Sequence, residues 1–334
     1  MSVTIDRPGA APIFDAPRSP RQIEIGLVNN MPDTALEATE RQFIALIEEA
    51  APDLAVRLKL YSLPEVTRGE RAAAHMKDRY RPIDALSHAA LDALIVTGAE
   101  PRAPDLREEP YWRRLTQIVD WAQANTTSTI FSCLAAHAAV LHLDGIARRP
   151  LGRKLFGVFA EETAAAHAFT CDLDLIATPH SRWNELREAH LAAAGYTILT
   201  RSREAGVGMF AKQQDSLLLF IQGHPEYEAE TLLREYRRDI GRYLRGEREG
   251  FPGRPRHYFG PRASDRIKAY RDRAIILRDR DYLAEFPIFE LRRAVRHVWR
   301  PGAVALYRNW LGLLERGKPR RLAARLARVE TAIR

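Results

Sequence analysis

Two side chains that could share a proton stand at the ends of apolar segments. Cys133 directly follows the strand expected at residues 128–132, and His224 follows, after one glycine, the strand expected at residues 217–222. Glu226 lies two residues beyond His224, and the intervening proline fixes an extended link that lets the carboxylate orient the imidazole. These groups suit acyl transfer, in which His224 first activates the thiol and later deprotonates an attacking hydroxyl.

Cys133 stands where a strand is expected to turn directly into a helix over residues 134–143. Unpaired N–H groups at a helix N-terminus favour a thiolate, and the N–H of Leu134 would help to hold an oxyanion. A second donor is expected from Gly98 and Ala99, which end another apolar run. A lone cysteine is more often a small core residue, and a His-Pro-Glu turn is ordinary by itself. The two motifs together favour catalysis.

Strand-length apolar runs alternate with helix-length amphipathic segments, which is the pattern of an α/β domain. Strands are expected at residues 23–29, 54–63, 91–97, 128–132, 173–178, 196–200, 207–211 and 217–222, and helices at about residues 36–49, 134–143 and 229–245. Open α/β sheets place their sites at the carboxyl ends of strands. Cys133 and His224 are therefore predicted to meet at one edge of a sheet.

Composition indicates a folded globular protein of 334 residues, 46% hydrophobic and 28% charged. No apolar run is long enough to span a bilayer, and the N-terminus lacks a secretory pattern. We therefore expect a cytoplasmic protein without a membrane partner, in which Cys133 and Cys171 are free thiols. No metal site is predicted, because the histidines lack ligand spacing with the cysteines.

Charge is distributed unevenly over the three expected parts of the chain. Residues 1–20 are proline-rich and are expected to form a disordered leader, residues 21–247 the catalytic α/β domain, and residues 248–334 an arginine-rich extension that packs on or extends it. Residues 241–334 hold 24 Lys and Arg against 10 Asp and Glu. Residues 318–334 are expected to form a basic amphipathic helix. We expect this helix to present a solvated arginine-rich face. The alternative is that it binds RNA, an acidic partner or the phosphates of coenzyme A.

The local sequences around these residues resemble the homoserine O-acyltransferase family called homoserine O-succinyltransferase, or homoserine transsuccinylase. The resemblance covers roughly residues 22–245 and a shorter piece near the C-terminus, with markers at residues 25–32, 39–43, 94–99, 111–112, 128–131, 179–182, 223–227 and 309–311. It implies a flavodoxin-like fold, akin to class I glutamine amidotransferases, with a mostly parallel sheet flanked by helices. It also implies a role in methionine biosynthesis and a ping-pong route through an acyl thioester. Homoserine and either succinyl-CoA or acetyl-CoA would be the substrates, with no bound cofactor.

Carried over position by position, the resemblance makes Cys133 the acyl-bearing nucleophile, His224 the general base and Glu226 its orienting partner. It assigns substrate contacts to Lys154, Ser181 and Arg238, with Glu235 as support from the same predicted helix as Arg238. Arginine and lysine suit a substrate carboxylate. Without the resemblance, a solvated helix face would be the plainer interpretation of Arg238.

Several positions depart from the family pattern. Leu134 and His137 replace a tryptophan and a glutamine, and His137 is expected to be structural. Arg102 occupies the acyl-donor selectivity position, where glycine accompanies succinyl-CoA and glutamate accompanies acetyl-CoA in the family. Charge favours the succinyl donor, although Arg102 could equally block the pocket or face solvent.

Other functions stay open at this point. They are an O-acetyltransferase, an acyltransferase for another hydroxy amino acid, a glutamine amidotransferase-like amidohydrolase, and a non-catalytic binding protein. Nucleic acid is not expected as a partner, because the combination of Cys133, His224 and Glu226 favours catalysis over binding alone. The sequence allows a homodimer without requiring one.

Overall fold

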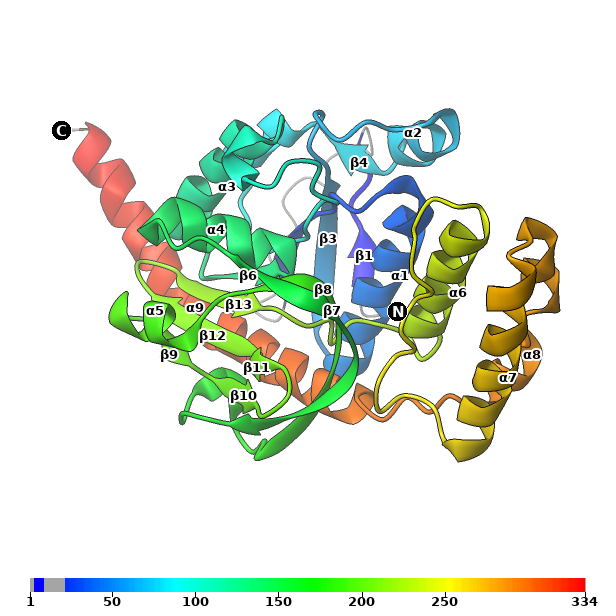
Figure 1. Ribbon diagram of the computed structural model, residues 1–334. Helices are drawn as coiled ribbons and strands as arrows, with labels where there is room; N and C mark the ends of the chain where they lie inside the picture. Colours follow the sequence, from blue (N-terminus) through cyan, green and yellow to red (C-terminus); the bar gives the residue numbers. More distant parts are fainter. Residues whose placement is uncertain (1–2, 9–21, 334) are drawn as a thin grey trace.

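The computed structural model describes residues 3–8 and 22–333, with side chains described as far as Gly317. Over these residues the strands form two sheets (Figure 1). The central sheet contains β1 (Val3–Ile5), β2 (Gln22–Val28), β3 (Ala55–Tyr61), β4 (Tyr80–Arg81), β5 (Ala93–Val96), β6 (Ser128–Ser132), β9 (Thr197–Ile198), β12 (Met209–Gln213) and β13 (Leu217–Ile221). The smaller sheet contains β7 (Arg149–Thr163), β8 (Leu175–Glu185), β10 (Thr200–Ser202) and β11 (Gly206–Val207).

The central sheet has the order β1-β3-β2-β5-β6-β13-β12-β9, with β4 paired to β3. Along this order, each neighbouring pair from β1 to β13 is parallel, whereas β12 pairs antiparallel with both β13 and β9. The successive strands β2, β3, β5, β6 and β13 stand in the order 2-1-3-4-5, which is the flavodoxin-like order. Continuous apolar runs such as β5 suit strands that are covered on both faces. The α/β class with a mostly parallel sheet is therefore confirmed.

Helices cover both faces of the central sheet. The helices of the described residues are α1 (Asp33–Ala50), α2 (Glu70–Lys77), α3 (Trp112–Asn125), α4 (Leu134–Asp144), α5 (Glu188–Ala193), α6 (Thr231–Leu244), α7 (Pro261–Leu277), α8 (Ile288–Ala294) and α9 (Arg300–Ile333), with short 3-10 turns at Ile83–His88, Leu106–Glu108, Ala168–Thr170 and Arg280–Glu285. One core cluster contains Phe43 of α1 and Trp310 of α9. The other contains Leu115 of α3 and Ala138 of α4. None of the helices, within the described residues, is both long and apolar enough to cross a bilayer.

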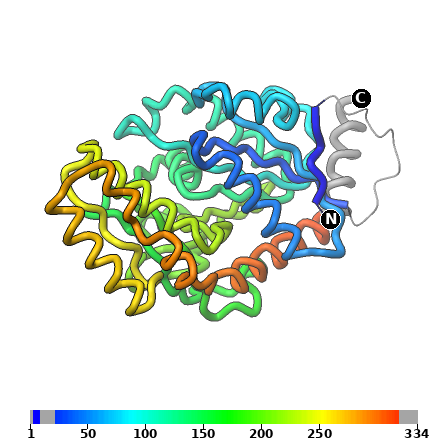
Figure 2. The backbone as a smooth tube through the Cα atoms, turned by 90° about the vertical axis from the view of Figure 1, so that its right-hand side faces the viewer, coloured from blue at the N-terminus to red at the C-terminus, as the bar shows by residue number. Residues whose placement is uncertain are grey.

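The arginine-rich extension is divided between two places. The first half of α9 belongs to the main core, where Trp310 is fully buried and its Nε1 donates to Ser128 Oγ at 3.1 Å. By contrast, Ile267 of α7 and Leu291 of α8 share a third apolar cluster with Leu232 of α6. Figure 2 shows α7 and α8 at the opposite end of the molecule from β1. The helix expected near the C-terminus is part of α9. The amphipathic face expected for residues 318–334 lies outside the side chains that the structure describes.

Three features differ from the sequence-based expectations. Residues 1–20 were expected outside the fold, yet β1 pairs in parallel with β3, because the edge of β3 is open and Val3 can be buried there. Residues 9–21 lie outside the described residues. The strand expected at 173–178 is the much longer β8, and its partner β7 had no strand-like pattern because charged and apolar residues are mixed in its first half. The runs at 196–200 and 207–211 are each split between the two sheets.

Candidate active site

The two reactive side chains leave neighbouring strands at the same edge of the sheet. β6 and β13 pair in parallel with Ser132 opposite Ile221, and Cys133 N–H donates to Ile221 O at 2.7 Å. His224 N–H donates to Pro179 O at 2.8 Å, which ties the segment after β13 to β8. The fold thus brings together Cys133 and His224, which are far apart in the sequence.

Cys133 occupies a strained turn between β6 and α4. Its φ of 53° and ψ of −113° are rare for a residue with a side chain, and such strain is typical of a nucleophile at a strand-to-helix turn. Gly98 packs directly against this turn, where an added Cβ would lie 2.5 Å from Leu134 Cβ. Leu134 begins α4, so helix geometry leaves its N–H without an intrahelical partner. A buried loop and an open helix N-terminus therefore meet beside the thiol.

His224 is held in a buried network. Its Nδ1 lies 2.8 Å from Glu226 Oε1, and its ring stacks on Tyr227 with 4.3 Å between centroids. Burial alone disfavours the charged imidazole, but charge interactions and hydrogen bonds with Cys133 and Glu226 hold the pKa of His224 well above its usual value. The arrangement therefore favours an imidazolium beside the sulfur of Cys133.

A cavity of about 560 Å³ opens over these groups. Its lining includes the predicted residues Gly98, Ala99, Cys133, Leu134, Lys154, Ser181, His224, Glu226, Glu235 and Arg238. Of the predicted site residues only Arg102 is not part of it. Residues from β7, β8, α6 and three strand ends of the central sheet therefore converge on one space.

Asp239 holds the two predicted substrate-binding cations together. Lys154 Nζ lies 3.1 Å from Asp239 Oδ2, and Arg238 Nη2 lies 2.9 Å from Asp239 Oδ1. Burial would raise the pKa of Asp239, but the adjacent Lys154 and Arg238 hold it below its ordinary value. Glu235 accepts hydrogen bonds from Ser181 Oγ and, at 2.8 Å, from Tyr227 O–H. One wall of the cavity therefore carries both positive and negative groups, as an amino-acid zwitterion would require.

Arg102 lies elsewhere. It is exposed beside a separate hollow of about 300 Å³, and its backbone N–H donates to Glu109 Oε1 at 2.5 Å. Arg148 lines the main cavity instead and is half-buried, with Nη2 donating to Pro104 O at 3.2 Å. No carboxylate within the described part of the chain forms an ion pair with Arg148. Burial lowers the pKa of Arg148, and the negative charge of Cys133 is among the interactions that oppose this shift.

A second buried network supports the cavity from the hairpin of β7 and β8. Arg182 Nε donates to His180 Nδ1 at 3.3 Å, and His180 Nε2 lies 2.7 Å from Glu161 Oε1. Burial lowers the pKa of Arg182, and the charge of Cys133 opposes that shift, so the guanidinium is within electrostatic range of the sulfur. Gly208 leaves room for Glu161, since a Cβ there would lie 1.9 Å from the carboxylate.

Several of these supporting residues carried little sequence signal. His180 and Arg182 were noticed only as parts of a marker segment, and their partner Glu161 lies on a strand that was not predicted. His137 was expected to be structural, and its Nε2 lies 2.9 Å from Gln222 Oε1. Burial lowers the pKa of His137 to about 3, so this imidazole stays neutral beside the cavity. For this group of residues, the sequence indicated only that His137 lies one helical turn from Cys133.

Comparisons with known proteins agree over most of the chain. The sequence model of a family described as homoserine O-succinyltransferase matches residues 15–318. A homoserine O-succinyltransferase of Rhodopseudomonas palustris is 49% identical over 316 residues, which are 92% of this chain and 95% of that protein. One of Bradyrhizobium japonicum is 48% identical over 304 residues, which are 90% and 92% of the two chains. Among solved structures, a glutamine amidotransferase from Thermotoga maritima matches with 13% identity and a TM-score of 0.47, over 88% of this chain and 98% of that one.

Proposed function

This chain belongs to the homoserine O-succinyltransferase family, and from that premise we propose that it transfers a succinyl group from succinyl-CoA to the hydroxyl of homoserine. The observation that carries the proposal is the pairing of Cys133 with His224 in a cavity that also presents Lys154 and Arg238. The product would be an activated homoserine ester for methionine biosynthesis.

In the proposed first half-reaction, the Cys133 thiolate attacks the thioester carbonyl of the donor. The N–H groups of Leu134 and of Gly98 or Ala99 stabilise the oxyanion, because they lie at the open helix N-terminus and the adjoining strand end. The carbon–sulfur bond to coenzyme A then breaks, and the departing thiolate takes the proton of the His224 imidazolium. An acyl thioester on Cys133 and free coenzyme A result.

In the proposed second half-reaction, neutral His224 accepts the proton of the homoserine hydroxyl while the oxygen attacks the Cys133 thioester. Collapse of the tetrahedral intermediate expels the Cys133 thiolate and releases the ester. The imidazolium and thiolate of the resting enzyme are thereby restored. Glu226 keeps the imidazole in one orientation through both steps, since it binds Nδ1 and leaves Nε2 for the reacting groups.

Homoserine would bind on the wall formed by β7, β8 and α6. Lys154 and Arg238 attract its carboxylate, while Glu235 attracts its ammonium group. Asp239 positions both cations and partly neutralises them. This wall suits an amino acid and gives the acceptor a fixed orientation towards Cys133.

The succinyl donor is supported by Arg148 rather than by Arg102. Arg148 lines the cavity that contains Cys133 and forms no ion pair with a carboxylate of the described residues, so a distal acyl carboxylate could pair with it. Arg102 faces a different hollow. An acetyl group has no carboxylate and so could not form an ion pair with Arg148.

The test offers purified protein succinyl-CoA or acetyl-CoA, each with homoserine or serine, and follows release of the coenzyme A thiol. Rapid release with succinyl-CoA and homoserine is expected. Mass spectrometry without acceptor should detect a succinyl adduct on Cys133 that is absent from Cys133→Ser. Glutamine hydrolysis without any acyl-CoA turnover would reject the proposal in favour of an amidohydrolase.

A further inference from the structure

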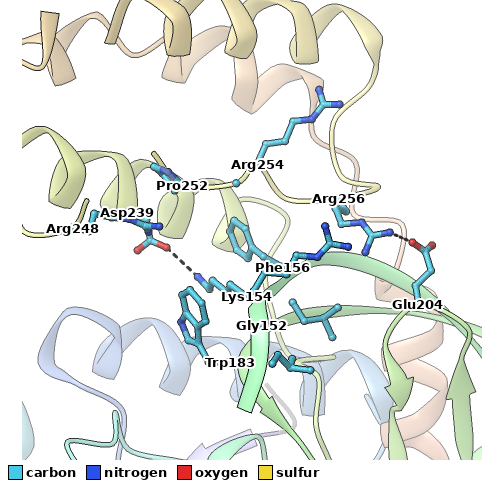
Figure 3. Close-up of a pocket in the computed structure, with 14 residues that line it drawn as sticks. Gly152, Lys154, Phe156, Trp183, Glu204, Asp239, Arg248, Pro252, Arg254 and Arg256 are labelled. Atoms are coloured by element: carbon cyan, nitrogen blue, oxygen red, sulfur yellow. Dashed lines mark hydrogen bonds and ion pairs between the residues drawn. The ribbon is translucent and has the colours of Figure 1, made fainter. Parts of the chain in front are cut away.

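A second hollow of about 820 Å³ adjoins the cavity over Cys133. The two spaces share Lys154, Trp183, Asp239 and Arg248. The remaining lining comes from the first half of β7, from Glu204, and from residues 252–256 after α6. Figure 3 shows Lys154 and Phe156 on the strand and Arg254 on the loop above it. A long ligand could therefore occupy both spaces at once.

The lining of this second hollow is strongly cationic. It contains the five cations Arg153, Lys154, Arg248, Arg254 and Arg256, but only the two carboxylates Glu204 and Asp239. Both carboxylates are already engaged, Glu204 by Arg256 and Asp239 by Lys154. The hollow therefore has an excess of positive charge that its own residues do not neutralise.

Arg153 and Arg254 differ from the paired cations. Neither forms an ion pair or a hydrogen bond with any residue that the structure describes, and both side chains are exposed. Arg248 donates only to a backbone oxygen, that of Gly250, at 2.8 Å. Three guanidinium groups around one hollow thus have donors available for an anion. Arginine suits phosphate because its planar group can donate two parallel hydrogen bonds.

The hollow is also held in shape by backbone contacts. Val158 N–H donates to Arg256 O and Arg256 N–H donates to Phe156 O, both at 2.9 Å, so the loop after α6 is fastened to β7. Gly157 makes this approach possible, because at its φ of 148° an added Cβ would lie 2.3 Å from Arg256 O. The two segments that line the hollow are therefore held together by backbone hydrogen bonds.

We propose that this arginine-lined hollow binds the phosphate groups of the nucleotide end of the acyl-CoA donor. The inference rests on the proposed function, which requires a thioester carbonyl at Cys133 and leaves the phosphates to lie outside that cavity. Arg153, Arg248 and Arg254 bind the phosphates, and Trp183 offers an aromatic surface at the junction of the two spaces. Its side chain is 52% exposed, which is unusual for tryptophan and leaves a ring face open to the donor.

The test compares the double variant Arg153→Gln/Arg254→Gln with Arg262→Gln/Arg273→Gln. The control removes the same charge from two exposed arginines of α7 that line neither space. Each protein is assayed with succinyl-CoA and with succinyl-pantetheine, a thioester that lacks the nucleotide and its phosphates. The measured quantity is kcat/KM for succinyl-CoA divided by kcat/KM for succinyl-pantetheine.

That ratio should fall at least about tenfold in Arg153→Gln/Arg254→Gln, since two charge-assisted contacts are lost, and stay within about twofold of wild type in the control. Adenosine 3′,5′-bisphosphate should compete with succinyl-CoA in the wild type and about tenfold more weakly in the variant. An unchanged ratio, or an equal fall in the control, would overturn the inference. Failure of wild-type protein to use either thioester would instead reject the proposed function.

Discussion

The strand-end site around Cys133 and the arginine-lined hollow use charge in opposite ways. At the strand ends, His224 and Glu226 are buried and bound to one another, and Arg182 is buried among hydrogen-bond acceptors. In the hollow, Arg153 and Arg254 are exposed and have no partner among the described residues. Buried charges tolerate little displacement because desolvation makes an unpaired charge costly, whereas exposed charges act over longer distances and are screened by salt.

This difference indicates separate roles for two adjoining spaces. The strand ends hold reacting atoms in fixed geometry, so substitutions there should reduce the rate of the chemical step. The hollow attracts and retains an anion, so substitutions there should change KM and its salt dependence while preserving the chemistry. The predictions below test that division.

The largest effect is expected for Cys133→Ser, which replaces the nucleophile without changing its size greatly. Turnover of succinyl-CoA should fall by at least about 10⁴-fold, as for the loss of a nucleophile in other triads. Stopped assays of thiol release measure it, and thermal unfolding checks that the fold is kept. Activity within a factor of ten of wild type would exclude covalent catalysis by this residue.

Glu226→Gln should reduce kcat by about 10²- to 10³-fold, because the imidazole loses its orienting carboxylate. The pKa of His224 is raised in the folded protein, in part by Glu226, so the imidazolium persists to higher pH in the wild type. Without that carboxylate the pKa of His224 should fall. The alkaline limb of the pH profile of kcat/KM for succinyl-CoA should therefore move to lower pH. An unshifted limb would mean that Glu226 does not act through His224.

Gly208→Ala tests the support behind the strand ends. The new Cβ would overlap the buried Glu161 carboxylate, so we expect a loss of about 2–4 kcal/mol in the free energy of unfolding. Chemical denaturation measures this value. Gly253→Ala is the matched control, because nothing lies within 4 Å of its added Cβ, and its effect should be within about 0.5 kcal/mol.

The smallest effect concerns the choice of donor. Arg148→Gln should lower the preference for succinyl-CoA over acetyl-CoA by about tenfold, the effect of one charge-assisted contact. Arg102→Gln should leave that preference unchanged, since Arg102 faces a separate hollow. Competition between the two donors measures the ratio directly. The reverse result would return the selectivity role to Arg102.

The sequence alone was sufficient for the parallel sheet and for the two reactive strand ends. Strands covered on both faces need continuous apolar runs, and β5 and β13 show them with Gly98 and His224 close behind. Parallel strands end on the same side, so a common sheet edge for the thiol and the imidazole followed from the sheet type, whereas the pairing of β6 with β13 came from the structure. Strand positions can be predicted from the sequence because they depend on the types of residues that are adjacent in the chain.

Only the tertiary structure decided how the surrounding charges are paired. Lys154 and Asp239 are 85 positions apart, and such a contact leaves no period in the sequence. The choice between Arg102 and Arg148 depended on how one loop packs, which neither residue type reveals. The hollow likewise exists because Gly157 lets a distant loop approach β7. Contacts between remote elements are set by the packing of the whole chain, and they determine which arginines are left free to bind a substrate.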